Sequence, residues 1–191
     1  ADARRAQEEP YQWQQARRWP ELKACLTDRP MFEALREQVS EEELWGYWLA
    51  LEANSKTRAD KAYKAAWTKW KTRNSDKATG DLADSLAEML RYAGRYGRFT
   101  EQLFRQSLRI DEKRLGLDHP DTGESLNNLA GLLQDQGDYA AAEPLSCRWE
   151  TPARMNLQTS QRPSPEPTSE PQTHRTRATA LPDGLVQRRN A

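Results

Sequence analysis

Hydrophobic residues in the first third of the chain recur at the spacing of amphipathic helices. The stretch 40–54 opens on Ser40 with Glu43 three residues later, which is the pattern of a capping box. Four of its apolar residues share one helix face at i, i+3, i+4 and i+7: Leu44, Tyr47, Trp48 and Leu51. A second stripe, with lysines opposite, follows in 57–72: Ala59, Tyr63, Ala66, Trp67 and Trp70. We find no period-two alternation bounded by turns, so an all-α fold is predicted.

Three shorter helices are predicted before these stripes. Pro10, Pro20 and Pro30 are each expected in the first turn of a helix, where a missing N–H costs little. The second helix would bury Leu22, Cys25 and Leu26, and the third would bury Met31, Leu35 and Val39. The tryptophans therefore favour core packing, although stacking platforms for nucleic-acid bases stay an alternative.

An internal repeat follows. "SLAEMLRYAGRYGRF" aligns with "SLNNLAGLLQDQGDY" at an offset of 40 residues. This alignment pairs Ser85 with Ser125, Leu86 with Leu126, Gly97 with Gly137, and Phe99 with Tyr139. In each copy we expect the glycine to end one helix tightly and the aromatic residue to open a second helix that packs back on the first.

Composition divides the chain of 191 residues into three regions. A Trp-rich helical connector is predicted for 1–78, repeats for 79–147, and a disordered tail for 148–191, which is rich in Pro, Ser and Thr. The tail could act as a polyproline-type ligand or touch RNA weakly, but a merely flexible terminus is the simpler interpretation. The formal net charge of 0 argues against nucleic-acid or membrane partners.

The cysteines and the first residues of the chain give expectations about the cellular compartment of the protein. Cys25 and Cys147 are far apart and have no ligand-like neighbours, so both are expected to be free thiols in a reducing, cytoplasmic compartment. No apolar run approaches the roughly 20 residues of a membrane span, and the charged start does not read as a signal peptide. Because the chain lacks an initiator Met, we expect that it was cut from something longer.

The segment "SLRIDEKRLGLDHPDTGESLNNLAGLLQDQGDYAAAEPL" resembles the long tetratricopeptide repeat of kinesin light chains and nephrocystin-like proteins. The resemblance implies stacked antiparallel helix pairs that form a solenoid. The earlier copy is degenerate, since "GRFTEQLFRQSL" is two residues short of the family pattern and implies a shortened or shifted second helix. Leu90 and Gln102 replace small residues there, whereas Ala130 and Ala142 keep them. The last repeat departs from the family after "AAEPL", which a truncated gene, a frameshift or an atypical terminus would explain.

In this family the first helix of each pair lines a groove that holds a protein or peptide partner. Carried over by register, the resemblance implies these candidate partner-binding residues: Asn127, Asn128, Gln134, Asp135, Glu88, Arg91 and Arg95, with Gly131 and Ala87 beside them. Asn128 occupies the place of the family's peptide-clamping Asn, and an amide both donates and accepts hydrogen bonds. The alternative is that the asparagines are only solvated polar positions.

The Trp-rich stretches "QWQQARRWPELKACLTDRPMFEAL" and "EEELWGYWLALE" resemble the connector between a nucleotide-binding STAND or NACHT module and its repeats. This implies a signalling NTPase as parent. The chain itself has no GxxxxGK[ST] loop, so no nucleotide or other cofactor is expected. The predicted function is a protein–protein interaction module. The alternative is an autoinhibitory segment that packs on the parent's own NTPase domain.

Catalysis and metal binding are not expected. His119 is not expected to bind a metal ion, because no second metal ligand lies near it in the sequence. We expect it to be a loop residue that helps start the next helix. Asp118, His119 and Ser125 supply the residue types of a triad, but adjacent Asp and His in one loop cannot easily form the relay. The chain is therefore not predicted to be an enzyme.

Overall fold

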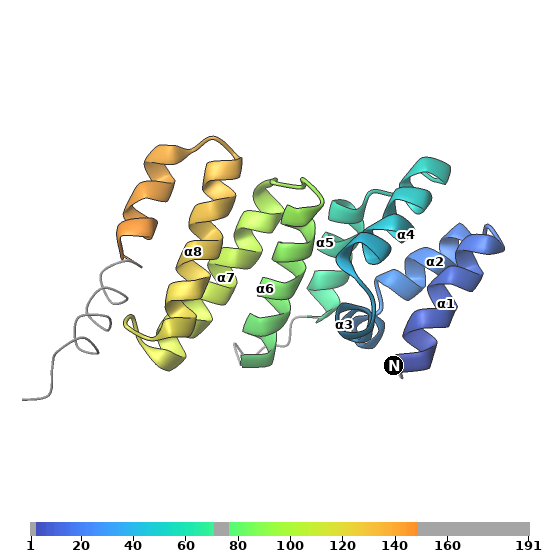
Figure 1. The fold of residues 1–191 in the computed structure, drawn as a ribbon, viewed down its shortest axis with the longest axis horizontal. Helices are drawn as coiled ribbons and strands as arrows, with labels where there is room; N and C mark the ends of the chain where they lie inside the picture. The colour runs from blue at the N-terminus through green and yellow to red at the C-terminus, as the bar shows by residue number, and fades with distance from the viewer. Residues whose placement is uncertain (1–2, 71–76, 149–191) are drawn as a thin grey trace, which may run out of the picture.

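The computed structural model describes residues 3–70 and 77–148, and this part of the chain is helical without strands. Figure 1 shows the helices stacked side by side along one long axis. They are α1 (Ala3–Gln15), α2 (Trp19–Leu26), α3 (Arg29–Gln38), α4 (Glu41–Asn54), α5 (Ala59–Trp70), α6 (Lys77–Tyr92), α7 (Arg98–Leu115) and α8 (Pro120–Asp135), followed by a helical segment over 139–148. The all-α prediction is confirmed. The predicted disordered tail falls almost wholly on 149–191, outside the described residues.

Local signals set several helix starts. Asp28 accepts a hydrogen bond from the Met31 backbone N–H, and Pro30 lies in the first turn of α3 as expected. Ser40 caps α4 by accepting from the Glu43 backbone N–H. The Glu43 carboxylate accepts from the Tyr47 hydroxyl at 2.8 Å, so Glu43 takes part in the cap through its backbone N–H while its side chain bonds within α4.

The placement of Pro10 was predicted wrongly. Pro10 lies inside α1, seven residues after its start, and is buried together with Ala6. A proline there removes the backbone bond that would reach residue 6. The small Ala6 side chain lies one turn earlier on the same face, and burial of the proline ring against the neighbouring helices offsets part of that loss.

The first region is held by an aromatic cluster that joins α3, α4 and α5. Phe32, Trp48, Tyr63 and Trp70 form ring contacts with centroids 5.0–5.8 Å apart. The Trp48 Nε1 donates to the Tyr63 hydroxyl at 3.0 Å, which satisfies the indole N–H inside the core. These tryptophans therefore pack, as the helical spacing predicted.

Cys25 belongs to the same core and, like the exposed Cys147, forms no disulfide among the described residues. Burial raises the pKa of the Cys25 thiol to about 12, so it stays protonated near neutral pH. Its role as core filler between Leu22 and Leu26 agrees with the predicted helix face.

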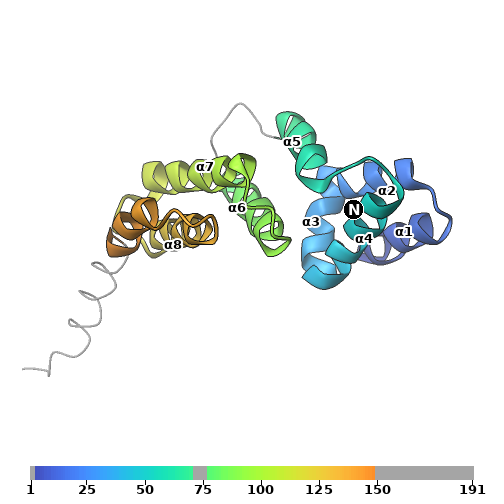
Figure 2. The ribbon, with the colours of Figure 1, turned by 90° about the horizontal axis from the view of Figure 1, so that it is seen from above.

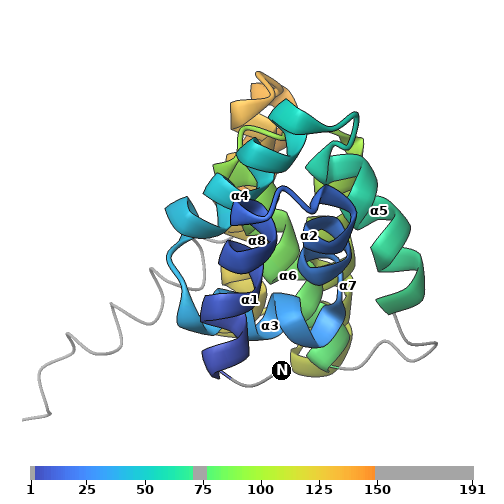
Figure 3. The ribbon, with the colours of Figure 1, turned by 90° about the vertical axis from the view of Figure 1, so that its right-hand side faces the viewer.

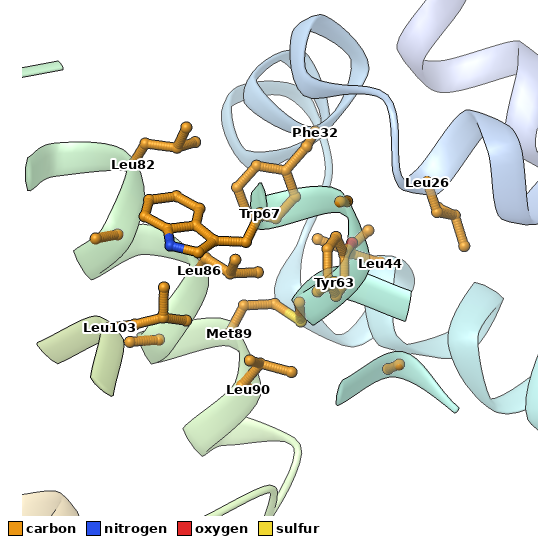
Figure 4. Packing of buried hydrophobic residues seen from close by; sticks show 14 of the residues in the cluster. Leu26, Phe32, Leu44, Tyr63, Trp67, Leu82, Leu86, Met89, Leu90 and Leu103 are labelled. Atoms are coloured by element: carbon orange, nitrogen blue, oxygen red, sulfur yellow. The ribbon is translucent and has the colours of Figure 1, made fainter. Parts of the chain in front are cut away.

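The first region continues into the repeats through one core. Figure 4 shows Trp67 of α5 and Phe32 of α3 beside Leu82 and Leu86 of α6. At the edge of this contact, Arg95 donates to the Glu52 carboxylate at 2.6 Å.

The repeat helices alternate between two sides of the stack. Figure 2 shows α6 and α8 on one side and α7 on the other. Seen along the long axis in Figure 3, α5 and α7 lie towards one side and α4 and α8 towards the opposite side. The helix pair α4–α5 thus precedes α6–α7 in the same alternating order.

The structural repeat is 43 residues, not the 40 expected from the "SL" match. Gly94 and Gly137 both have positive φ, at 68° and 82°, and each follows the end of the first helix of its pair. The hydrogen bonds that end α6 and α8 correspond one to one at this spacing: Arg95 N to Leu90 O and Asp138 N to Leu133 O, both 2.8 Å. Gly97 has a φ of −73° and is the N-cap of α7 instead.

This register changes three further expectations about the first copy. Leu90 corresponds to Leu133 rather than to Ala130, and both leucines are buried. The helix α7 has 18 residues, so it is not shortened. Phe99 packs partly buried against the core whereas Tyr139 is 70% exposed, because Tyr139 corresponds to the exposed Tyr96.

Candidate partner-binding surface

The facing sides of α6 and α8 are joined by a buried polar contact. The Asn128 amide Nδ2 donates to both carboxylate oxygens of Asp84, at 3.3 and 3.5 Å. Sequence reasoning did not single out Asp84. In the 43-residue register it corresponds to Asn127, one position before its partner, and that register would have identified it.

Burial raises the pKa of the Asp84 carboxyl to about 7. The nearby charges of Glu88, Glu124 and Asp111 raise it further, and the hydrogen bond from Asn128 opposes them. Three helices therefore contribute carboxylates around one half-buried acid, so the charge at this point of the surface changes near neutral pH.

Arg91 and Asp135 form a second link between α6 and α8. The Arg91 Nε donates to Asp135 at 2.6 Å, and both side chains are about one-third exposed. A Cβ at Gly131 would lie 2.7 Å from an Arg91 guanidinium nitrogen. Gly131 therefore leaves the space in which this guanidinium lies flat against α8.

Glu88 and Arg95 face the first region. Arg36 of α3 approaches the Glu88 carboxylate at 3.5 Å, and burial raises the pKa of Glu88. Arg95 bonds Glu52 and lies over the Trp45 ring at 5.5 Å. The structure thus places Arg95 in the contact between α4 and α6, and it buries Ala87 completely. Ala87 does not border the surface as the 40-residue register suggested.

Asn127 and Gln134 are exposed on α8, seven residues apart and so on one helix face. Within the described ranges, neither side chain makes a hydrogen bond. Their amides are therefore free to donate to and accept from a bound chain.

Two clefts lie beside α6. One of about 340 Å³ lies among α6, α7 and α8. Its lining includes five carboxylates: Asp81, Asp84, Asp111, Asp121 and Glu124. A second, of about 290 Å³, lies between α3 and α6 and is lined by Phe32, Arg36 and Leu82 among others.

The residue types of a catalytic triad are not brought together. The Ser125 hydroxyl donates to Asp111 at 2.6 Å, while His119 Nδ1 accepts from the Asp121 backbone N–H at 3.1 Å. His119 caps α8, which confirms its predicted role at the helix start. Among the described residues, no group of three His, Cys, Asp or Glu side chains is arranged to hold a metal ion, and no helix could cross a membrane.

The repeat region was compared with models of known protein families. The model of the tetratricopeptide repeat family matches residues 79–148. A search of curated proteins finds no match. Tetratricopeptide repeats generally serve protein–protein interaction, in most cases as scaffolds without catalysis. Residues 79–148 are therefore similar to tetratricopeptide repeats, and the antiparallel α6–α7 pair and the matching helix ends 43 residues apart agree with that similarity.

Proposed function

We propose that the surface formed by α6 and α8 binds an extended segment of a protein partner. The observation that carries the proposal is the pair of free amides, Asn127 and Gln134, on the first helix of a matched tetratricopeptide repeat. Side-chain amides on one helix face can hydrogen-bond the backbone of a bound peptide, and such bonds depend little on the sequence of the peptide.

The links between α6 and α8 support this use of the surface. Asn128 with Asp84 and Arg91 with Asp135 hold the two helices at a fixed spacing before a partner arrives. A preorganised surface loses less entropy on binding than one that must be ordered. In this proposal Asn128, Asp135, Glu88 and Arg91 shape the surface, and Arg95 fixes it to α4.

The test selects peptides on the full chain from a random display library and measures their affinity by fluorescence anisotropy. The double variant Asn127→Ala/Gln134→Ala should weaken the selected peptides by about tenfold, since each lost hydrogen bond is worth about 1 kcal/mol. Arg109→Ala, which removes an exposed side chain of α7 on the other side of the stack, is the matched control.

Two results would reject this surface. One is a set of peptides whose affinity is unchanged by the α8 variant. The other is a loss that the α7 variant reproduces. Circular dichroism of each variant excludes unfolding as the cause.

We further propose that the chain is the repeat-bearing part of a larger STAND-type signalling protein of the cytoplasm. Support comes from the resemblance of 12–35 and 41–52 to the connectors of such proteins. The alternative proposal, an autoinhibitory contact with the parent's nucleotide-binding domain, rests on the same resemblance. A phosphate-binding loop upstream in the same reading frame would support this parent, and its absence from the complete gene would reject it. Binding of the purified chain to that domain, but not to selected peptides, would favour autoinhibition.

A further inference from the structure

A further cleft, distinct from the two beside α6, lies in the first region between α2, α3 and α5 and has a volume of about 720 Å³. It involves neither α6 nor α8. Six basic side chains line it: Lys23, Arg29, Lys56, Arg58, Lys61 and Lys69. The formal net charge of 0 for the whole chain hides this local concentration of positive charge.

Most of these charges have no partner within the protein. Arg29 pairs with Glu33 at 2.9 Å, and Arg58 pairs with Asp60 at 3.1 Å. Across the described ranges, the ammonium groups of the four lysines form no hydrogen bond or ion pair, and all four residues are exposed. The one acidic residue of the lining, Asp28, caps α3 through the Met31 N–H. The cleft therefore has unneutralised positive charge.

Apart from Thr27 and Thr57, the remaining lining is made of small and apolar groups: Ala24, Pro30, Ala62, Ala65, Ala66 and Trp70. The Trp70 ring is buried, and its Nε1 donates to the Thr27 carbonyl at 3.1 Å. The ring is thereby fixed as part of the wall rather than free to stack on a base. Small side chains on α5 leave room for the side chains or backbone of a ligand.

We propose that this cleft binds an acidic amphipathic peptide segment of a protein partner, with carboxylates against the lysines and small apolar side chains against the alanines. A free phosphate would match the charge but would leave the apolar wall uncovered. Single-stranded nucleic acid needs exposed aromatic faces for stacking, and the lining offers none among the described residues. An acidic peptide satisfies both parts of the lining. This site is separate from the α6–α8 surface and does not depend on it.

The test titrates the full chain with a fluorescein-labelled designed peptide that carries Glu on one helix face and Ala and Leu on the other. The double variant Lys61→Glu/Lys69→Glu should weaken binding by about tenfold or more, and added salt should weaken wild-type binding. The matched control is Lys64→Glu, which reverses an exposed charge on α5 outside the lining and should change affinity less than about twofold.

Three outcomes overturn the proposal: no binding of the acidic peptide, equal weakening by Lys64→Glu, or displacement of the peptide by a mixed-sequence single-stranded oligonucleotide at lower concentration than by unlabelled peptide. The last would make the cleft a nucleic-acid site. Because the substitutions lie on exposed positions, unchanged circular dichroism spectra are expected and separate a binding effect from unfolding. The Asn127→Ala/Gln134→Ala variant should keep full affinity for this probe, so failure here is distinct from failure of the α6–α8 surface.

Discussion

The helices of residues 3–70 and those of residues 77–148 bury their apolar faces with different kinds of side chain. The first group closes on the aromatic cluster of Phe32, Trp48, Tyr63 and Trp70. The second group packs leucines and alanines, and repeats its buried positions every 43 residues. The aromatic rings fill a core of irregular shape that occurs once in the chain. The leucine and alanine layers of the repeats have the same form in each copy, so further helix pairs could pack on them in the same way. The repeats can therefore extend a surface, and the connector anchors its end.

The two regions also differ in charge. Residues 55–70 carry five basic side chains and one acidic one. The helices α6 and α8 together carry six acidic side chains and two basic ones. The two regions thus present surfaces of opposite charge, although the formal net charge of the whole chain is 0.

The largest expected effect breaks the aromatic core. Trp48→Ala removes a fully buried ring and leaves the Tyr63 hydroxyl without its donor. We expect a loss of about 3–5 kcal/mol in the free energy of unfolding, measured by urea titration followed by circular dichroism. Because one hydrophobic core runs through both regions, a single transition should shift to lower urea.

Leu49→Ala is the control for this variant. Leu49 follows Trp48 directly in α4 but is 53% exposed, so its loss should cost less than about 0.5 kcal/mol. Two separate transitions in Trp48→Ala, with the repeat helices unaffected, would show that the regions fold independently and that their shared core contributes little.

Much of the first region could be predicted from the sequence, because its stripes are long and strongly periodic. The buried face of α4 was predicted residue by residue, that of α5 was predicted except for Ala62, and the cap at Ser40 follows from a local pattern. Pro10 could not be placed, because its position inside α1 depends on burial against helices that are distant in sequence.

The repeat register shows a different limit. The two "SL" pairs at 85 and 125 match as letters, but burial aligns Leu86 with Leu129. The backbone hydrogen bonds that fix the true register depend on Gly94, and a second nearby glycine, Gly97, obscured it. The contact of Asp84 with Asn128 follows only once the register is correct.

A smaller effect is expected on the pH dependence of the free energy of unfolding. It should arise at the acidic surface of α6 and α8 and not in the uncharged aromatic core. The pKa of Asp84 is raised to about 7 in the folded chain, so folding favours its protonated form. Its contribution to stability is fully present below about pH 4, where the unfolded carboxyl is also protonated, and is lost as pH rises through 7. We expect the free energy of unfolding to fall by roughly 1–2 kcal/mol over this window because of Asp84.

Asp84→Asn keeps the shape and removes the charge. It should leave stability at pH 4 nearly unchanged and raise it at pH 8, which flattens the pH dependence measured by urea titration. Asp81→Asn, at an exposed position one turn earlier on α6, is the control and should leave the slope in place. A slope that Asp84→Asn does not reduce would assign the effect to the neighbouring Glu88, whose pKa is also raised by burial.

The smallest effect tests the register itself. Gly94→Ala and Gly137→Ala should each cost about 1 kcal/mol, because both glycines have positive φ and a side chain disfavours that backbone conformation. Gly97→Ala should cost less, at most about 0.5 kcal/mol, since Gly97 has a φ of −73° and open space at its Cβ position, and the lost backbone freedom of the unfolded chain offsets the poorer N-cap that alanine makes. Urea titration of the three variants decides between the two alignments. If Gly97 and Gly137 proved costly while Gly94 did not, the 40-residue register would hold, and the pairing of α6 with α8 through Asp84 and Asn128 would have to be given up.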